Sequence, residues 1–152
     1  QDGDVVVVDI GGTTAAGYCS DSTRTYALGT PSKSFLEEYA VLQRAQSAAS
    51  AAVAPGITCE EIDSVSRDIL TQAGLGDLFI HRTGHGIGLE THEEPYIVSG
   101  NSRRLEPGMA FSIEPGFYRP GVVGSRIEDI VVCGADGPIM CNERPHELAV
   151  VD

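Results

Sequence analysis

The order of apolar and polar positions predicts strands at both ends of the chain and helices between them. The valine run Val5–Val8 is β-branched and continuous, which is typical of a strand buried on both faces. It ends at Asp9, and a glycine-rich turn then leads into a returning strand over residues 18–26. Further short strands are predicted at 79–81, 95–98, 109–114, 125–133 and 148–151.

Two helices are predicted between these groups of strands. Apolar side chains recur at helical spacing from Phe35 to Val53, and Pro55 and Gly56 end this pattern. Thr58 followed by Glu61 forms a capping box that begins a second helix, which ends near residue 74. A strand pair, two helices and then several strands predict an α/β or α+β domain, in which the helices lie on one side of a largely antiparallel sheet.

Composition and charge narrow the function classes. The 152 residues are 41% hydrophobic, which fits one globular domain. Lys and Arg number 10 against 22 Asp and Glu, for a net charge of −12, which argues against nucleic acid and anionic membranes as partners. No apolar run approaches the roughly 18 residues that a membrane-spanning helix needs. The chain is expected to be cytoplasmic.

The four cysteines show no metal-binding spacing. Cys19, Cys59, Cys133 and Cys141 form no CxxC pair and no dense framework. Free thiols in a reducing cytoplasm are therefore expected, with a disulfide or a zinc knuckle as the less favoured alternatives.

The first candidate chemistry is a pair of aspartates. Asp9 and Asp21 are separated by the glycine-rich turn, so pairing of their strands would place both carboxylates on one face of the sheet. Two adjacent anions repel each other and need a cation or a shared proton, and a metal ion is the simpler solution. Taken singly, each aspartate could instead be an ordinary turn former.

Three of the four histidines fall within twelve residues. His81, His85 and His92 are separated by glycines, which let the backbone fold tightly enough for the imidazoles to converge. One imidazole as a metal ligand and the others as proton carriers is the functional interpretation. A buried structural histidine or a surface turn would explain one of them more simply than all three.

Two glutamates lie in apolar, strand-like surroundings. Glu114 and Glu128 would be costly in a buried strand unless each is paired or bound to metal, and an arginine partner at the surface is the alternative for either one alone. Four carboxylates and one imidazole make an oxygen-rich set. It suits two adjacent divalent ions of the manganese, cobalt or iron type better than a structural zinc site.

With these residues in this order, the chain resembles the pita-bread metallopeptidases, and within them the group of Xaa-Pro dipeptidases (prolidases) and Xaa-Pro aminopeptidases. The matching segments occur in family order and span nearly the whole chain: residues 8–11, 17–25, 84–88, 91–93, 106–109, 112–118 and 126–129. Asp9 and Asp21 stand one residue further apart than in the family pattern, and the extra residue falls in the turn between Gly11 and Gly17. The family's upstream helices and N-terminal domain have no counterpart here. The resemblance therefore implies that residues 1–152 are a C-terminal catalytic domain truncated at its N-terminus. It implies an α+β pita-bread fold, an antiparallel sheet with helices on its outer face, of which the first half is incomplete.

The resemblance also implies a role for each candidate residue. The metal ligands would be Asp9, Asp21, His85, Glu114 and Glu128, with Asp21 and Glu128 bridging two divalent ions. Glu114 would also take a proton from the bridging water. His81 and His92 would line the substrate pocket and carry protons, and Arg126 would support catalysis beside the bridging glutamate.

The function implied by the resemblance is hydrolysis of the Xaa-Pro bond in dipeptides or short peptides by a hydroxide that bridges two metal ions. Manganese is the favoured metal, with cobalt, iron or zinc as alternatives, and the full-length protein is expected to be a homodimer. Two other functions stay open, a methionine aminopeptidase-like enzyme and a non-catalytic peptide-binding module on the same fold. The complete ligand set argues against a creatinase-like member and favours an enzyme.

Overall fold

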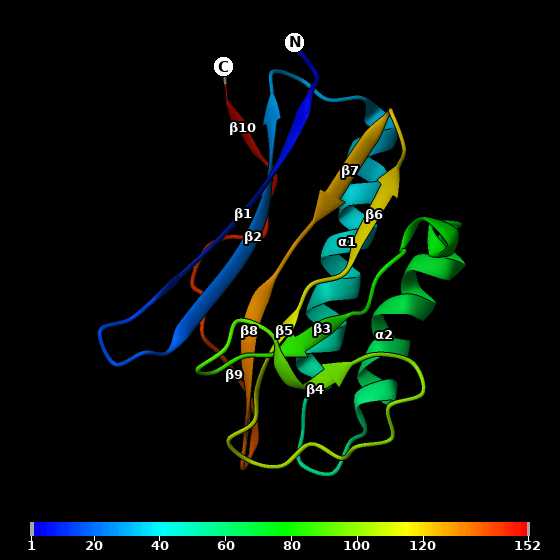
Figure 1. Cartoon of the computed structure of the whole chain (residues 1–152). Coiled ribbons are helices and arrows are strands. Elements are labelled where there is room, and N and C mark those ends of the chain that lie inside the picture. Colours follow the sequence, from blue (N-terminus) through cyan, green and yellow to red (C-terminus); the bar gives the residue numbers. More distant parts are fainter. Residues whose placement is uncertain (1, 152) are drawn as a thin grey trace.

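The computed structural model describes residues 2–151, which form a long hairpin, two helices and a small antiparallel sheet (Figure 1). The hairpin consists of β1 (Val5–Thr13) and β2 (Cys19–Leu28), paired antiparallel from Val5 opposite Ala27 to Thr13 opposite Cys19. The short strand β10 (Ala149–Val151) pairs in parallel with the other edge of β2. The predicted pairing of the first two strands is therefore confirmed.

The prediction that the first strand is buried on both faces was wrong. Val6 and Ile10 are 43% and 54% exposed, because one face of β1 is left open within residues 2–151. The strand also continues beyond the valines to Thr13, so Asp9 lies inside the strand and not at its end.

The second sheet has five strands in the order β4-β3-β5-β8-β9, all paired antiparallel. These strands are β3 (Gly84–Gly86), β4 (Glu93–Ile97), β5 (Ala110–Ile113), β8 (Asp129–Gly134) and β9 (Gly137–Met140). A separate two-stranded ribbon is made by β6 (Gly116–Arg119) and β7 (Val123–Arg126). The sequence pattern did not predict β3, β6 or β9.

Two of the later strand predictions need correction. Residues 79–81 form no strand, because Phe79 ends the short 3₁₀ helix η1 (Gly76–Leu78) and the chain then runs irregularly to β3. The predicted strand 125–133 is interrupted: β7 ends at Arg126, and Glu128 leaves the β5–β8 ladder to form an isolated bridge with Thr23. This interruption carries a glutamate out of the sheet and against β2.

Helices α1 (Lys33–Ala51) and α2 (Cys59–Gln72) cover one side of the sheets, as Figure 1 shows. The Ser32 hydroxyl accepts the Phe35 amide at the start of α1, and the predicted capping box of Thr58 and Glu61 begins α2. The buried face of α1 supplies Phe35, Leu42, Ala45 and Ala49 to two apolar clusters that continue into the sheets. The predicted α+β fold with helices on one face is confirmed.

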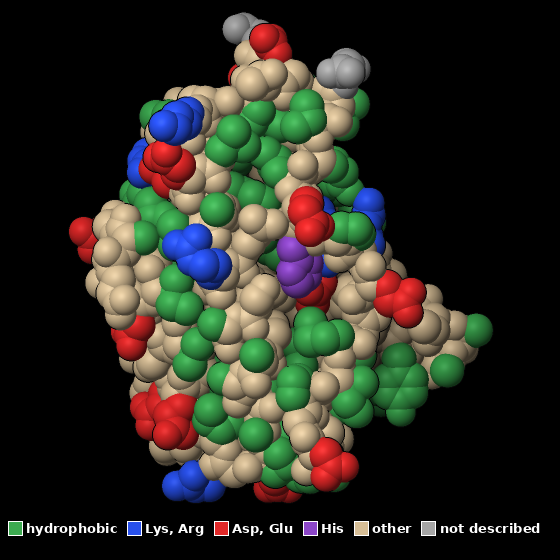
Figure 2. All heavy atoms as spheres, turned by 180° about the vertical axis from the view of Figure 1, so that it is seen from behind, with side chains coloured by type: hydrophobic (Ala, Val, Ile, Leu, Met, Phe, Trp, Pro, Cys, Tyr) green, Lys and Arg blue, Asp and Glu red, His purple; other side chains and the backbone are tan. Residues whose placement is uncertain are grey.

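Neither the charged side chains on one face of the molecule (Figure 2) nor the cysteines form a specialised feature among the described residues 2–151. On the face shown in Figure 2, acidic, basic and apolar side chains are interspersed, so the surplus of acids does not gather into one patch there. All four cysteines are free thiols. Within residues 2–151, neither long helix combines the length and the apolar character that crossing a membrane requires.

Candidate metal centre

The hairpin places both candidate aspartates on one face. Asp9 lies opposite Thr23 in the β1–β2 pair, and Asp21 precedes Thr23 by two residues on the same face of β2. The two aspartates are therefore diagonal neighbours. Their proximity and the burial of Asp21 both act on that carboxyl: burial raises its pKa, and Asp9 raises it further.

His85 occupies the centre of the site on β3, where it is 2% exposed. A side chain at either neighbouring position would collide with backbone, because a Cβ on Gly84 would stand 1.8 Å from the Ser112 carbonyl oxygen and one on Gly86 2.4 Å from that of Glu94. The two glycines thus let β4 and β5 close around the imidazole.

The orientation of His85 leaves one ring nitrogen facing carboxylates. Its Nδ1 donates a hydrogen bond to the Gly86 carbonyl oxygen at 3.1 Å, so Nε2 is the unprotonated nitrogen of the neutral ring. That Nε2 lies 3.3 Å from Glu114 Oε1, 3.8 Å from Asp21 Oδ2 and 3.9 Å from Glu128 Oε1. The ligand atoms of Asp21, His85 and Glu128 all lie within 4.8 Å of one another.

Hydroxyl groups fix the two glutamates. Thr23 Oγ1 donates to Glu128 Oε2 at 2.6 Å, and Ser112 Oγ donates to Glu114 Oε1 at 3.1 Å. The same Ser112 hydroxyl accepts the backbone N–H of His85 at 3.0 Å. Both carboxylates are thereby turned toward the imidazole before any ligand binds.

Burial and mutual repulsion disfavour the charged forms of the carboxyl groups in this cluster. Burial, with Glu114 nearby, raises the pKa of Glu128 to about 8, and burial raises the pKa of Glu114 to about 7. Burial also lowers the pKa of His85, so its ring is held neutral. A lone pair of Nε2 that faces three carboxylate groups has nothing to bind except protons or a metal ion. The donor set of oxygens with one imidazole fits divalent ions of the first transition row.

Asp9 stands at the rim of this cluster. Its side chain is 48% exposed, and its Oδ2 accepts a hydrogen bond from Arg126 at 2.5 Å. The Arg126 guanidinium also reaches Thr23 Oγ1 at 3.3 Å and the Tyr118 hydroxyl at 2.8 Å. Arg126 therefore ties Asp9 on β1 to the ribbon β6–β7.

The remaining two candidate histidines have different neighbours: His92 lies against His85, and His81 binds Tyr118. The His92 ring centre is 4.2 Å from that of His85. His81 donates from Nδ1 to the Arg82 carbonyl oxygen, so its Nε2 accepts from the Tyr118 hydroxyl at 3.2 Å. Burial, together with nearby arginines, lowers the pKa of His81, so this ring is also neutral.

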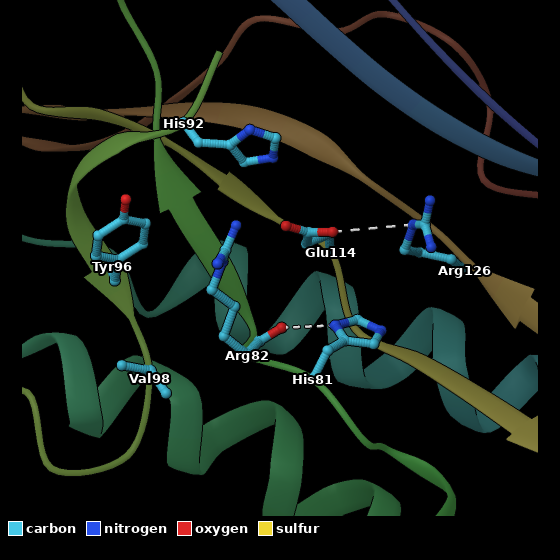
Figure 3. A pocket seen from close by; sticks show the side chains of 7 residues that line it. All are labelled: His81, Arg82, His92, Tyr96, Val98, Glu114 and Arg126. Atoms are coloured by element: carbon cyan, nitrogen blue, oxygen red, sulfur yellow. Dashed lines mark hydrogen bonds and ion pairs between the residues drawn. The ribbon is translucent and has the colours of Figure 1, made fainter. Parts of the chain in front are cut away.

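A pocket of about 750 Å³ opens directly beside Glu114 (Figure 3). Its walls come from the segment before β3, the segment around β4, the end of β5 and β7. The lining residues are His81, Arg82, His92, Tyr96, Val98, Glu114 and Arg126. A cavity of this size next to convergent polar groups suits a small ligand such as a dipeptide.

The structure thus brings all eight predicted site residues into one region. Of the five predicted ligands, His85 lies at the centre, and Asp21, Glu114 and Glu128 lie around its Nε2 atom. It adds four residues to which sequence reasoning gave no role: Thr23, Arg82, Ser112 and Tyr118. Thr23 could have been predicted, because it lies two residues after Asp21 and therefore on the same face of the strand. The others depend on contacts between distant segments, for which the sequence pattern carries no signal.

Comparisons with known proteins agree with this picture. A model of metallopeptidase family M24 matches residues 1–135. The chain is 60% identical over 151 residues to a protein named probable dipeptidase PepE from Mycobacterium bovis, covering 99% of this chain and 40% of the relative. It is 57% identical over 137 residues to an Xaa-Pro dipeptidase from Lactobacillus helveticus, covering 90% of this chain and 37% of the relative.

The fold has solved counterparts as well. A recombinant prolidase from Thermococcus sibiricus superposes with a TM-score of 0.96 at 44% identity, covering 99% of this chain and 41% of that one. The chain therefore spans about two fifths of the length of the relatives that it matches.

Proposed function

Since the chain belongs to metallopeptidase family M24, we propose that it forms the metal centre of a peptidase that cleaves the bond before proline in dipeptides or short peptides. The observation that carries the proposal is the lone pair of His85 Nε2 facing three buried or half-buried carboxylates beside a pocket. The fold is that of the pita-bread prolidases. On this proposal residues 1–152 are a catalytic metallopeptidase domain.

The metal-binding residues of the proposal are Asp9, Asp21, His85, Glu114 and Glu128. When two divalent ions are bound, they would supply a water of lowered pKa and polarise the carbonyl of the bond to be cleaved. Manganese is the proposed metal, because the set is rich in oxygen ligands. Asp9 would exchange its bond with Arg126 for a metal ion, a shift that its exposed position at the rim allows.

The chain's own residues would then handle the proton and the substrate. Glu114 accepts the proton of the attacking water, and the elevated pKa of its buried carboxyl suits it to hold that proton. The same proton passes to the proline nitrogen as the peptide bond breaks. His92 would stabilise the tetrahedral species, and His81, held by Tyr118, would contact the substrate from the opposite wall.

Two further features belong to the proposal and extend beyond the described residues. A homodimer and a cytoplasmic location are both proposed from the resemblance to proline-directed peptidases. Neither affects the local chemistry of the five metal-binding residues.

The direct test is release of proline from an Ala-Pro dipeptide by the manganese-loaded protein, with a chelator-treated sample beside it. Release is expected only with metal. Glu114→Gln should abolish it, whereas Glu106→Gln, an exposed acid outside the pocket, should leave it intact. Chelator-resistant release would refute a metallopeptidase, and release of methionine from Met-Ala in place of proline would favour the aminopeptidase alternative.

A further inference from the structure

The pocket beside Glu114 contains two arginines, and only one of them forms ion pairs within residues 2–151. Arg126 donates to Asp9, Thr23 and Tyr118, and its Nε lies 3.9 Å from Glu114 Oε2. Its charge is therefore shared among the groups of the candidate metal centre. It has little capacity left for an anionic ligand.

Arg82 is the other arginine, and its guanidinium has a buried donor without a partner. Its Nε is buried without a hydrogen-bond partner, and its side chain forms no hydrogen bond or ion pair with any residue in the described range 2–151. The guanidinium carbon lies 5.0 Å from the centre of the Tyr96 ring, a cation–π contact that holds it at the pocket wall. Figure 3 shows the side chain extending between Tyr96 and Glu114.

The backbone beneath Arg82 is held firmly, so the free guanidinium is not the tip of a loose loop. The Arg82 carbonyl accepts from His81, and the next residue, Thr83, donates through both its N–H and its hydroxyl to buried Asp63. Arg67 of α2 binds the same Asp63 and donates to the His81 carbonyl. The guanidinium is thus positioned with no ion-pair partner among residues 2–151, although it is near enough to Glu114 to act on the pKa of that carboxyl by lowering it.

A half-buried guanidinium with free donors is costly unless an anion joins it, and its planar fork matches a carboxylate. We propose that Arg82 binds a carboxylate group of the peptide substrate, an inference that rests on the proposed peptidase function. Two carboxylates can reach it: the free C-terminus of a dipeptide, or an acidic side chain on the residue before proline. Either one makes Arg82 a residue that determines which peptides are accepted.

The experiment compares substrate pairs that differ only in a charge. Ala-Pro against its C-terminal amide reports the terminal carboxylate, and Glu-Pro against Gln-Pro reports the acidic side chain. Values of kcat/KM for these four peptides are measured on manganese-loaded wild type, Arg82→Gln and Arg103→Gln. The last variant is a matched control, because Arg103 is exposed and lies outside the pocket.

Wild type is expected to prefer the charged member of one pair by about 10- to 100-fold, the size expected for a charge-assisted hydrogen bond. Arg82→Gln should bring that ratio close to one through KM, with Arg103→Gln like wild type. The pair that responds identifies the carboxylate. Ratios in Arg82→Gln equal to wild type on both pairs would overturn the inference while leaving the peptidase function intact.

Failure of the proposed function has a different signature. If the wild type hydrolyses none of the four peptides, calorimetric titration of both pairs, Ala-Pro with its amide and Glu-Pro with Gln-Pro, into the metal-loaded protein still measures recognition. Weaker binding of the charged member of one pair to Arg82→Gln, with the uncharged member unaffected, would support a carboxylate site on a chain without peptidase activity. Equal binding of the charged and uncharged members of both pairs to both proteins would overturn the inference as well.

Discussion

Replacing Arg24 with methionine should destabilise the protein more than any ordinary surface change, because this guanidinium is a buried hub. Arg24 is 5% exposed and Asp129, to which it donates at 2.6 Å, is fully buried. The remaining donors reach the carbonyl oxygens of Thr23, Glu128, Arg144 and Pro145 at 2.7–2.8 Å. One side chain therefore joins β2, the start of β8 and the segment before β10.

The magnitude follows from what Arg24→Met leaves behind. Burial alone would raise the pKa of Asp129, but its bonds with His146 and Arg24 hold that pKa below the usual range. Without Arg24 the carboxylate keeps His146 and Gln46, and four carbonyl oxygens lose a donor. Removing one partner of a buried ion pair costs about 3–5 kcal/mol, a large part of the roughly 5–15 kcal/mol that stabilises a domain.

Urea unfolding followed by circular dichroism at 222 nm measures this loss. Arg44→Met is the matched control, because Arg44 is exposed on α1 and bonds only its own helix at Ala40, so a change within about 0.5 kcal/mol is expected. Arg24→Lys should fall between the two, since it keeps the charge but not the fork of donors. A free energy of unfolding for Arg24→Met within about 1 kcal/mol of wild type would refute the claim that the buried bonds of Arg24 stabilise the fold.

Three further substitutions test other parts of the account. Asp63→Ala leaves Arg67 and Thr83 without their shared partner; it should lower the free energy of unfolding by about 3–5 kcal/mol, and an unchanged urea midpoint would contradict this. Asp21→Asn should sharply weaken manganese binding in calorimetric titration, and an unchanged stoichiometry of two ions would argue against its bridging position. His92→Ala should lower kcat by about 10²- to 10⁴-fold with metal content intact, and loss of metal instead would make His92 a ligand.

Local features of this fold could be predicted where neighbouring residues decide them. The capping box of Thr58 and Glu61 and the pairing of the first two strands depend on short segments, and both are confirmed. The pairing also predicted that Asp9 and Asp21 lie on one face. Three histidines separated by glycines correctly indicated imidazoles gathered in one region.

Features that depend on distant contacts could not be predicted in the same way. The valines of β1 predicted burial on both faces, but Val6 is exposed because the face of β1 on which it lies is not covered by other parts of residues 2–151. The apolar pattern around Glu128 predicted an uninterrupted strand, whereas its bridge to Thr23 breaks the ladder. The lack of a partner for Arg82 Nε within residues 2–151 depends on where distant segments place their side chains, which the sequence pattern does not indicate.

The number of metal ions per chain is the measurement that tests the central claim most directly. The protein is dialysed against manganese and then against metal-free buffer, and its bound metal is quantified by plasma mass spectrometry beside that of Glu128→Gln. The account predicts two ions per chain in the wild type and a clear loss in the variant, because Glu128 faces His85 from the middle of the cluster. A wild type without bound manganese, or a variant that retains both ions, would contradict the assignment of these carboxylates to a dinuclear metal centre.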